Sequence, residues 1–235
     1  MVANALVYHP TTAHLLRYLD STVGRDKLMR FVQYFARFYV AYLNRTAGSS
    51  KNSADVWRSV MSLLSTARKI IRVGKPVQHF KAAATAYDNK TTDPVIRYTA
   101  IGRQLSYAVY LTIDTLILGH STKLITLKNP QLAQKLYFRF WLAGIVFSIS
   151  SSAYKHVGLS KLQTSLSNQS EKDVVAIKNV KAQQASNTTQ LVLDLLDSSI
   201  PVSGLSLVPI DDGLVGIAGM VSSVIGASAQ WDATA

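Results

Sequence analysis

Hydrophobic and polar residues follow a helical pattern along most of the chain. Apolar side chains recur three and four positions apart, which is the spacing of helices with one apolar face. Runs that alternate every second residue between turn signals, as strands do, are missing. Polar interruptions fall at 46–54, 88–93, 128–129, 160–172 and 198–204. The pattern predicts an all-α fold of several helices.

Two of these interruptions end in a signal for the start of a helix. Asp93 precedes Pro94, and Asn129 precedes Pro130. A short polar side chain can accept a hydrogen bond from the first free backbone N–H groups, and proline suits the first turn, where it has no N–H to satisfy. Helices are therefore expected to begin at both prolines.

Residues 56–73 form the most strongly patterned segment, an amphipathic helix that Gly74 and Pro76 would end or kink. At 100° per residue the apolar side chains share an arc of roughly 140°. They are Val56, Trp57, Val60, Leu63, Leu64, Ala67, Ile70 and Ile71. The cations of the segment, Arg58, Arg68, Lys69 and Arg72, lie outside this arc and have no acidic residue among them.

Such a helix can be the inner face of a bundle or a helix that lies in a lipid interface. The cations favour the interface, because without acidic neighbours they gain no ion pairs along the helix. Small serines among the cations and Trp57 at the edge of the apolar arc are also typical of interfacial helices. Each cation near an anionic leaflet is worth about 1 kcal/mol. We therefore expect the apolar residues to insert into a membrane and the four cations to bind lipid headgroups.

The charge of the chain is strongly uneven. The formal net charge is +12, yet hydrophobic residues make up 48% of the chain and charged residues only 16%. Residues 1–170 hold 22 of the 25 Lys and Arg and 6 of the 13 acidic residues. This asymmetry indicates a polyanionic partner, either an anionic membrane or nucleic acid. The absence of cysteine excludes disulfides and thiolate metal sites.

Three later segments are apolar enough to enter a membrane. Residues 213–229 carry no charge and contain small residues at every fourth position, Ala218, Ser222 and Gly226, a pattern that allows close helix packing in lipid. Residues 140–154 are also uncharged, with cations and aromatic residues at their ends. Residues 105–125 are long enough but contain Asp114, so we expect partial insertion or burial. The fold class is therefore a membrane-associated helical bundle with one or more hydrophobic membrane helices.

The segment 21–45 carries a second helical pattern rich in aromatic and basic residues. Its motif consists of Gly24, Arg25, Asp26, Lys27, Arg30, Phe31, Gln33, Tyr34 and Arg37. This motif resembles the N-terminal signature of the peroxin eleven family of peroxisomal membrane proteins. The later order, a basic amphipathic helix followed by semi-apolar helices and a glycine-rich apolar span, is similar to that family over nearly the whole chain.

The resemblance implies a protein of the peroxisomal membrane that inserts an amphipathic helix, self-associates, elongates the membrane and helps to recruit a dynamin-type fission machinery. It implies no cofactor and gives the signature residues a role in packing or oligomerisation. By this layout the chain has three regions: an amphipathic region 1–87, middle helices 88–200 and a C-terminal membrane helix 201–235. Asp194 and Asp197 are a candidate contact for the basic N-terminal region of the same or another copy.

Residues for catalysis or metal binding are scarce. The five histidines lie far apart in the sequence, and Glu171 is the one glutamate. No phosphate loop, nucleophile motif or zinc motif is present. We therefore expect no enzyme, no catalytic residue and no metal. Two alternatives to membrane remodelling stay open: a pore for small metabolites, which Asp114 favours, and a soluble basic nucleic-acid-binding protein, which leaves the apolar span 213–229 unexplained.

Overall fold

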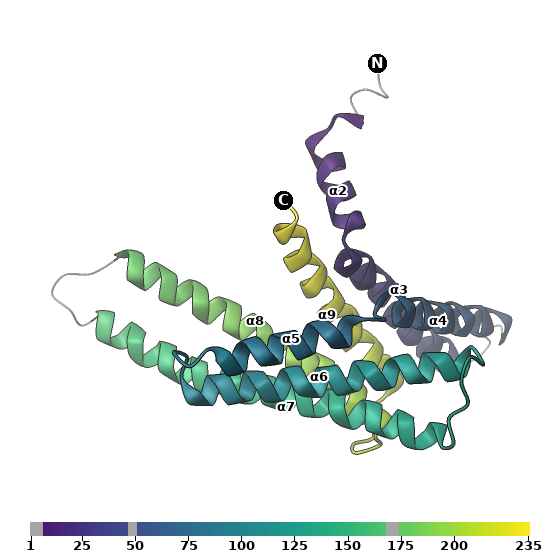
Figure 1. The fold of residues 1–235 in the computed structure, drawn as a ribbon. Helices are drawn as coiled ribbons and strands as arrows, with labels where there is room; N and C mark the ends of the chain where they lie inside the picture. The colour runs from purple at the N-terminus through teal and green to yellow at the C-terminus, as the bar shows by residue number, and fades with distance from the viewer. Residues whose placement is uncertain (1–6, 47–50, 168–173) are drawn as a thin grey trace. The chain divides into compact units, whose positions relative to one another are not determined.

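The structure is a computed structural model that describes residues 7–46, 51–167 and 174–235. In these ranges the chain is helical and has no strand, which confirms the predicted all-α class. Figure 1 labels the helices, which in chain order are α2 (Pro10–Asp20), α3 (Thr22–Arg45), α4 (Lys51–Ile71), α5 (Lys75–Asp88), α6 (Pro94–Ser121), α7 (Pro130–Ser167), α8 (Val174–Gly204) and α9 (Asp212–Ala233).

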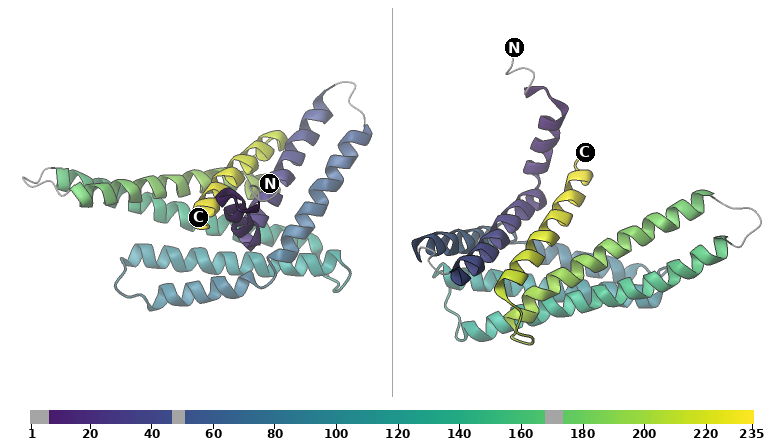
Figure 2. Two further views of the ribbon diagram at one scale, coloured as in Figure 1. Left: turned by 90° about the horizontal axis from the view of Figure 1, so that it is seen from above. Right: turned by 180° about the vertical axis from the view of Figure 1, so that it is seen from behind.

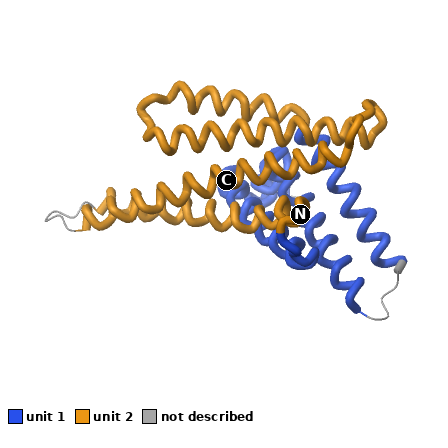
Figure 3. The backbone as a smooth tube through the Cα atoms, turned by 90° about the horizontal axis from the view of Figure 1, so that it is seen from below, with its two compact units in different colours: residues 1–72, 208–235 blue, residues 73–207 orange. Residues whose placement is uncertain are grey.

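The helices group into two compact units (Figure 3). The first unit combines residues 1–72 with 208–235, and the second comprises 73–207. This grouping differs from three consecutive regions, because the C-terminal helix α9 packs on α3 near the other end of the chain.

In the first unit, α3 is the central helix and packs against both α4 and α9. It begins after Ser21, whose hydroxyl accepts a hydrogen bond from the backbone N–H of Gly24 at 2.9 Å. Gly24 itself is buried beside the backbone carbonyl of Tyr18, where a larger residue would not fit. The helix ends at Arg45, so the predicted signature helix 21–45 is confirmed to within one residue.

In the second unit, α5 packs against α6, α6 against α7 and α7 against α8. Figure 2 shows α7 and α8 as a long pair that run side by side. The side chain of Asp93 accepts a hydrogen bond from the N–H of Val95 at 2.8 Å, and that of Asn129 accepts one from Leu132 at 2.9 Å. Both predicted helix starts are confirmed.

Several predicted interruptions are wrong because the helices continue through them. Helix α4 begins at Lys51, α7 extends to Ser167, and α8 continues through Pro201 to Gly204. Polar side chains in these segments bond to carbonyls of their own helix, as Ser198 does to Leu195 at 2.7 Å, so they do not end it. Gly74 does separate α4 from α5, with φ of 87°. Residues 168–172 lie outside the described residues.

Candidate membrane-binding surface

One side of α4 is covered by α3. The ring of Trp57 packs edge-on against Phe35 and Tyr39, with centroid distances of 5.5 and 5.4 Å. Further along α4, the side chain of Arg68 reaches the polar residues of α3. Aromatic packing at one end and a polar cluster at the other therefore fix α4 on α3.

Arg68 lies in the interior of the first unit, so its predicted place on the headgroup-binding face is wrong in this conformation. It is 8% exposed, and its guanidinium donates to the carboxylate of Asp26 at 3.0 Å and to the side-chain oxygen of Gln33 at 2.8 Å. At 100° per residue, Arg68 is only about 20° around the helix from Trp57. The residue therefore shares the side of α4 that α3 covers.

The other three cations have different surroundings. Arg58 is exposed and donates to the carboxylate of Asp55 at 2.6 Å, an ion pair that the predicted segment, starting one residue later, left out. The Nε of Arg72 donates to the carbonyl of Arg68 at 3.1 Å. Arg72 and Lys69 are half-buried. These three remain the candidate headgroup-binding residues.

The apolar arc of α4 divides into a covered edge and an open edge. Val56, Leu63 and Ile70 lie seven residues apart and are 60%, 69% and 56% exposed. We call these three residues the open apolar row. The remaining predicted insertion residues, Val60, Leu64, Ala67 and Ile71, are half-buried beside it. Three large aliphatic side chains thus stay in contact with the surroundings although α4 is packed on α3.

Helix α3 buries two charged residues and leaves three large apolar residues exposed. Asp26 and Arg30 are buried, whereas Leu28, Phe31 and Val32 are about two-fifths exposed. An aqueous surface favours the opposite arrangement. Exposed apolar side chains over buried, paired charges are what a lipid environment favours.

The signature residues of α3 mainly make contacts inside the first unit. The guanidinium of Arg30 lies 5.4 Å from the ring centroid of Tyr34. The side chain of Lys27 lies against Gly226 of α9, and Arg25 and Phe31 are exposed. Asp26 and Gln33 bind Arg68 as described above. The predicted packing role is thus seen within one chain, and the predicted role in oligomerisation stays a prediction.

Helix α9 packs on α3 through its small residues. Gly216 faces the backbone of Phe38, and Gly219 lies against the ring of Tyr34. Of the predicted packing residues, Ser222 is fully buried and Gly226 meets Lys27, while Ala218 is only half-buried. Gly216 and Gly219 lie three residues apart, and this spacing was the sequence signal for the contact with α3. The predicted pattern of a small residue at every fourth position did not include it. Val215 is fully buried, whereas four other large residues of α9 are 41–60% exposed: Leu214, Ile217, Val221 and Val224.

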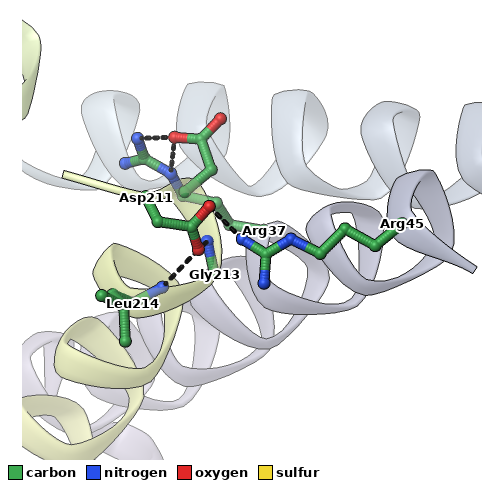
Figure 4. A network of polar contacts seen from close by, with 6 residues as sticks. Arg37, Arg45, Asp211, Gly213 and Leu214 are labelled. Carbon is green, nitrogen blue, oxygen red and sulfur yellow. Dashed lines mark hydrogen bonds and ion pairs between the residues drawn. The ribbon is translucent and has the colours of Figure 1, made fainter. Parts of the chain in front are cut away.

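Polar contacts hold both ends of α9. Figure 4 shows the N-terminal end, where Arg45 pairs with Asp211, and Arg37 donates to Asp212 at 2.5 Å. Asp211 also accepts from the N–H of Gly213 at 2.8 Å. The hydrogen bond from Arg45 holds the pKa of Asp211 below its ordinary value, and the backbone N–H bonds act in the same direction.

At the C-terminal end of α9, two residues of α2 contact its last carbonyl groups. His14 bonds to the carbonyl of Trp231 at 2.8 Å, and Arg17 donates to that of Thr234 at 2.8 Å. A cation at this end also interacts favourably with the helix dipole. The N-terminal helices therefore bind α9 along its whole length.

Two helices of the described residues are long and apolar enough to cross a membrane, α7 and α9. Only 22% and 33% of their most apolar windows are buried, whereas the core helix of a soluble protein is mostly buried. Residues 140–154 and 213–229 lie within these two helices. Asp114 of α6 is 2% exposed, in agreement with the expected burial.

Asp194 is not available for the contact that the sequence predicted with the basic N-terminal region. It is 4% exposed, and the hydroxyl of Ser148 and the amide of Gln190 donate to its carboxylate at 2.5 and 2.9 Å. The prediction for Asp194 is therefore wrong, because the residue is buried inside the second unit.

The class that these features define is an all-α membrane protein. It has buried charged residues, exposed apolar side chains on α3, α4 and α9, and two long apolar helices. The family model described as "Peroxisomal biogenesis factor 11 (PEX11)" matches residues 12–231. The chain belongs to this family. It is a protein of the peroxisomal membrane that is involved in peroxisome proliferation.

Three curated relatives match over at least 95% of both chains. Peroxisomal membrane protein PMP30A of Candida boidinii is 31% identical, with 100% of this chain and 99% of the relative covered. Peroxisomal membrane protein PMP27 of Saccharomyces cerevisiae is 29% identical, with both chains fully covered. Peroxisomal biogenesis factor 11 of Schizosaccharomyces pombe is 23% identical over 95% and 96% of the two chains. No solved structure matches this chain.

Proposed function

We propose that the protein elongates the peroxisomal membrane by inserting the open apolar row of α4 into one lipid leaflet. The observation that carries the proposal is the exposure of Val56, Leu63 and Ile70 on a helix that is otherwise docked on α3. Insertion of a shallow helix expands the headgroup area of one leaflet and so favours a curved membrane.

Apolar and electrostatic contributions support insertion together. Half-burying three large aliphatic side chains contributes roughly 1 kcal/mol each. Arg58, Lys69 and Arg72 near anionic headgroups contribute about 1 kcal/mol each. Arg68 instead holds α4 on α3 through Asp26, so the inserting helix α4 stays attached to the rest of the first unit.

The proposed role is structural and not catalytic, and it requires no cofactor. Among the described residues, no three His, Asp or Glu side chains gather where they could hold a metal ion. By resemblance to the family, the partners are the anionic membrane, further copies of the chain and a dynamin-type fission machinery, and nucleic acid is not among them. Burial of Asp114 leaves that residue as a poor lining for a pore.

The test is to reconstitute the full-length protein into vesicles that contain anionic phospholipid and to measure tubulation by electron microscopy. We expect the wild type to form tubules and the double variant Leu63→Glu with Ile70→Glu to form none. Carboxylates on the open apolar row oppose burial in acyl chains. The double variant should therefore keep its helical content but lose membrane deformation.

The matched control places two glutamates on the polar side of the same helix, at Ser62 and Ser65, which lie among its cations. Ser62→Glu with Ser65→Glu changes the net charge by the same amount, so electrostatic repulsion is equal in both variants. The control should retain most of the tubulation. If both variants tubulate vesicles as the wild type does, insertion of the row is not the mechanism.

A further inference from the structure

The second unit contains a cavity that the proposed membrane insertion does not use. Its volume is about 640 Å³, and it lies between α6, α7 and α8. Each helix contributes residues three or four positions apart, such as Ile96, Thr99 and Arg103 of α6. One face of each helix is therefore directed at the same space. The volume is in the range of cavities that bind small molecules.

Most of the residues that line the cavity have polar side chains. Hydroxyl and amide groups come from all three helices, among them Thr99, Ser148, Ser152, Asn187 and Gln190. Polar groups that lose water without gaining a hydrogen bond are costly. Ser148 and Gln190 donate to Asp194, and Asn187 donates to the carbonyl of Ser152, so most of these groups have partners within the second unit. Their remaining donors and acceptors suit water or a polar ligand.

The charged groups that line the cavity are both cations, Arg103 and Lys155. The Nε–H of Arg103 is buried and has no hydrogen-bond partner in the structure. A guanidinium with a free, buried donor is arranged to bind an anion, because planar N–H groups match the oxygens of phosphate or carboxylate. Lys155 is exposed at the cavity and adds a second positive charge.

Two carboxylates lie near the cavity and are already engaged. Asp194 accepts from Ser148 and Gln190, and Asp93 accepts from the hydroxyl of Tyr154 at 3.0 Å. Burial raises the pKa of Asp194 above its ordinary value, which the hydrogen bond from Ser148 partly offsets. The charge of Asp194 also acts on Arg103 and partly neutralises it. No carboxylate is among the residues that line the cavity itself.

Aromatic residues fill the neighbouring layer of the bundle. The ring centroid of Tyr110 lies 4.8 Å from the ring centroid of Tyr137 and 5.5 Å from that of Trp141. Tyr107 packs beside them, 6.2 Å from Tyr110, and a Cβ on Gly144 would meet its ring at 2.8 Å. The guanidinium of Arg103 lies 5.6 Å from the centroid of Tyr107. The rings therefore pack beside Arg103, and none of these four aromatic residues lines the cavity itself.

The geometry points to a binding site for a phosphate group in the cavity between α6, α7 and α8, held by Arg103 and Lys155. Three phosphate oxygens accept bonds from the guanidinium and the ammonium, and the serine hydroxyls and amides bind the hydroxyl groups of the attached molecule. The phosphate comes either from a phosphoinositide headgroup or from a soluble phosphorylated, hydroxyl-rich metabolite. This site is separate from α4 and does not depend on membrane insertion.

The test uses full-length protein in nanodiscs and isothermal titration calorimetry. In nanodiscs of phosphatidylcholine alone, soluble inositol 1,4-bisphosphate is the probe; a second set of nanodiscs contains phosphatidylinositol 4-phosphate. Binding of the soluble probe in the first set supports a metabolite site. The lipid headgroup is the source if phosphatidylinositol 4-phosphate in the nanodiscs prevents binding of the soluble probe. The same follows if Arg103→Gln and Lys155→Gln change binding of the lipid but not of the soluble probe.

The variants Arg103→Gln and Lys155→Gln should each weaken binding at least tenfold. Lys161→Gln is the matched control, because Lys161 is an exposed residue of the same helix outside the cavity. Lys155 is itself exposed, so its variant is expected to fold even where Arg103→Gln does not. Absence of binding in both sets, or an equal loss in Lys161→Gln, overturns the proposal and leaves a hydrated cavity only.

Discussion

At the scale of single residues, the same residue type has different roles along one helix. Arg58 and Arg68 are both cations of α4, yet one lies on the surface and the other bonds to Asp26 in the interior. The wheel of a single helix does not show which side a neighbouring helix covers. The assignment of Arg68 to the headgroup-binding residues failed for this reason.

The structural role of Arg68 predicts a large loss of stability in Arg68→Gln. The variant removes the buried ion pair between Arg68 and the carboxylate of Asp26, and breaking such a pair typically costs about 3 kcal/mol. Thermal unfolding of the detergent-solubilised protein, followed by circular dichroism, should show a clearly lowered midpoint. Arg58→Gln removes an exposed pair worth less than about 1 kcal/mol and is the control. Equal midpoints for the two variants would contradict the assignment.

At the scale of elements, the contact between α3 and α9 depends on glycine. Gly216 lies so close to Phe38 that a Cβ would be 2.7 Å from the backbone nitrogen of Phe38. Backbone atoms cannot turn aside as a flexible side chain can. The two helices therefore approach closely only while this position has no side chain.

Gly216→Ala should accordingly separate α9 from α3 and destabilise the first unit by about 1–3 kcal/mol. Gly158→Ala is the matched control, since Gly158 is also helical but a Cβ there would meet nothing within 4 Å. Alanine favours helix over glycine by up to about 1 kcal/mol, so the control should be neutral or stabilising. Chemical denaturation in detergent measures both. A stabilised Gly216→Ala would refute the close contact.

Local signals predicted where helices begin more reliably than where they end. The starts at Pro94 and Pro130 depend on side chains one residue away, Asp93 and Asn129, and both were found. The continuation of α8 through Pro201 depends on packing, since Pro201 is fully buried among other residues. A polar or proline-containing segment stays helical when its neighbours in space support it.

At the scale of the whole molecule, the first unit is made from both ends of the sequence. Helix α9 covers Tyr34 and Phe38 of α3, and its first residues neutralise Arg37 and Arg45. Helices α3 and α4 therefore require a segment that follows them by about 140 residues in the chain. The second unit is one continuous segment.

Deletion of residues 208–235 should therefore affect the two units differently. Without α9, amide hydrogen exchange in α3 and α4 should be at least tenfold faster, because apolar and charged groups lose their partners. Exchange in α6 and α7 should change little. Hydrogen–deuterium exchange with mass spectrometry measures both units in one sample. Unchanged exchange in α3 would show that α9 does not stabilise it.

The sequence by itself determined the helical class, the amphipathic character of α4 and the two apolar helices, because these follow from periodicity and composition along one segment. The signature helix and its family resemblance were also read from local residues. Only the tertiary structure decided that Arg68 is internal, that Val56, Leu63 and Ile70 are the open part of the apolar arc, and that α9 lies on α3. These features depend on which helices meet, and that is set by contacts between residues far apart in the chain.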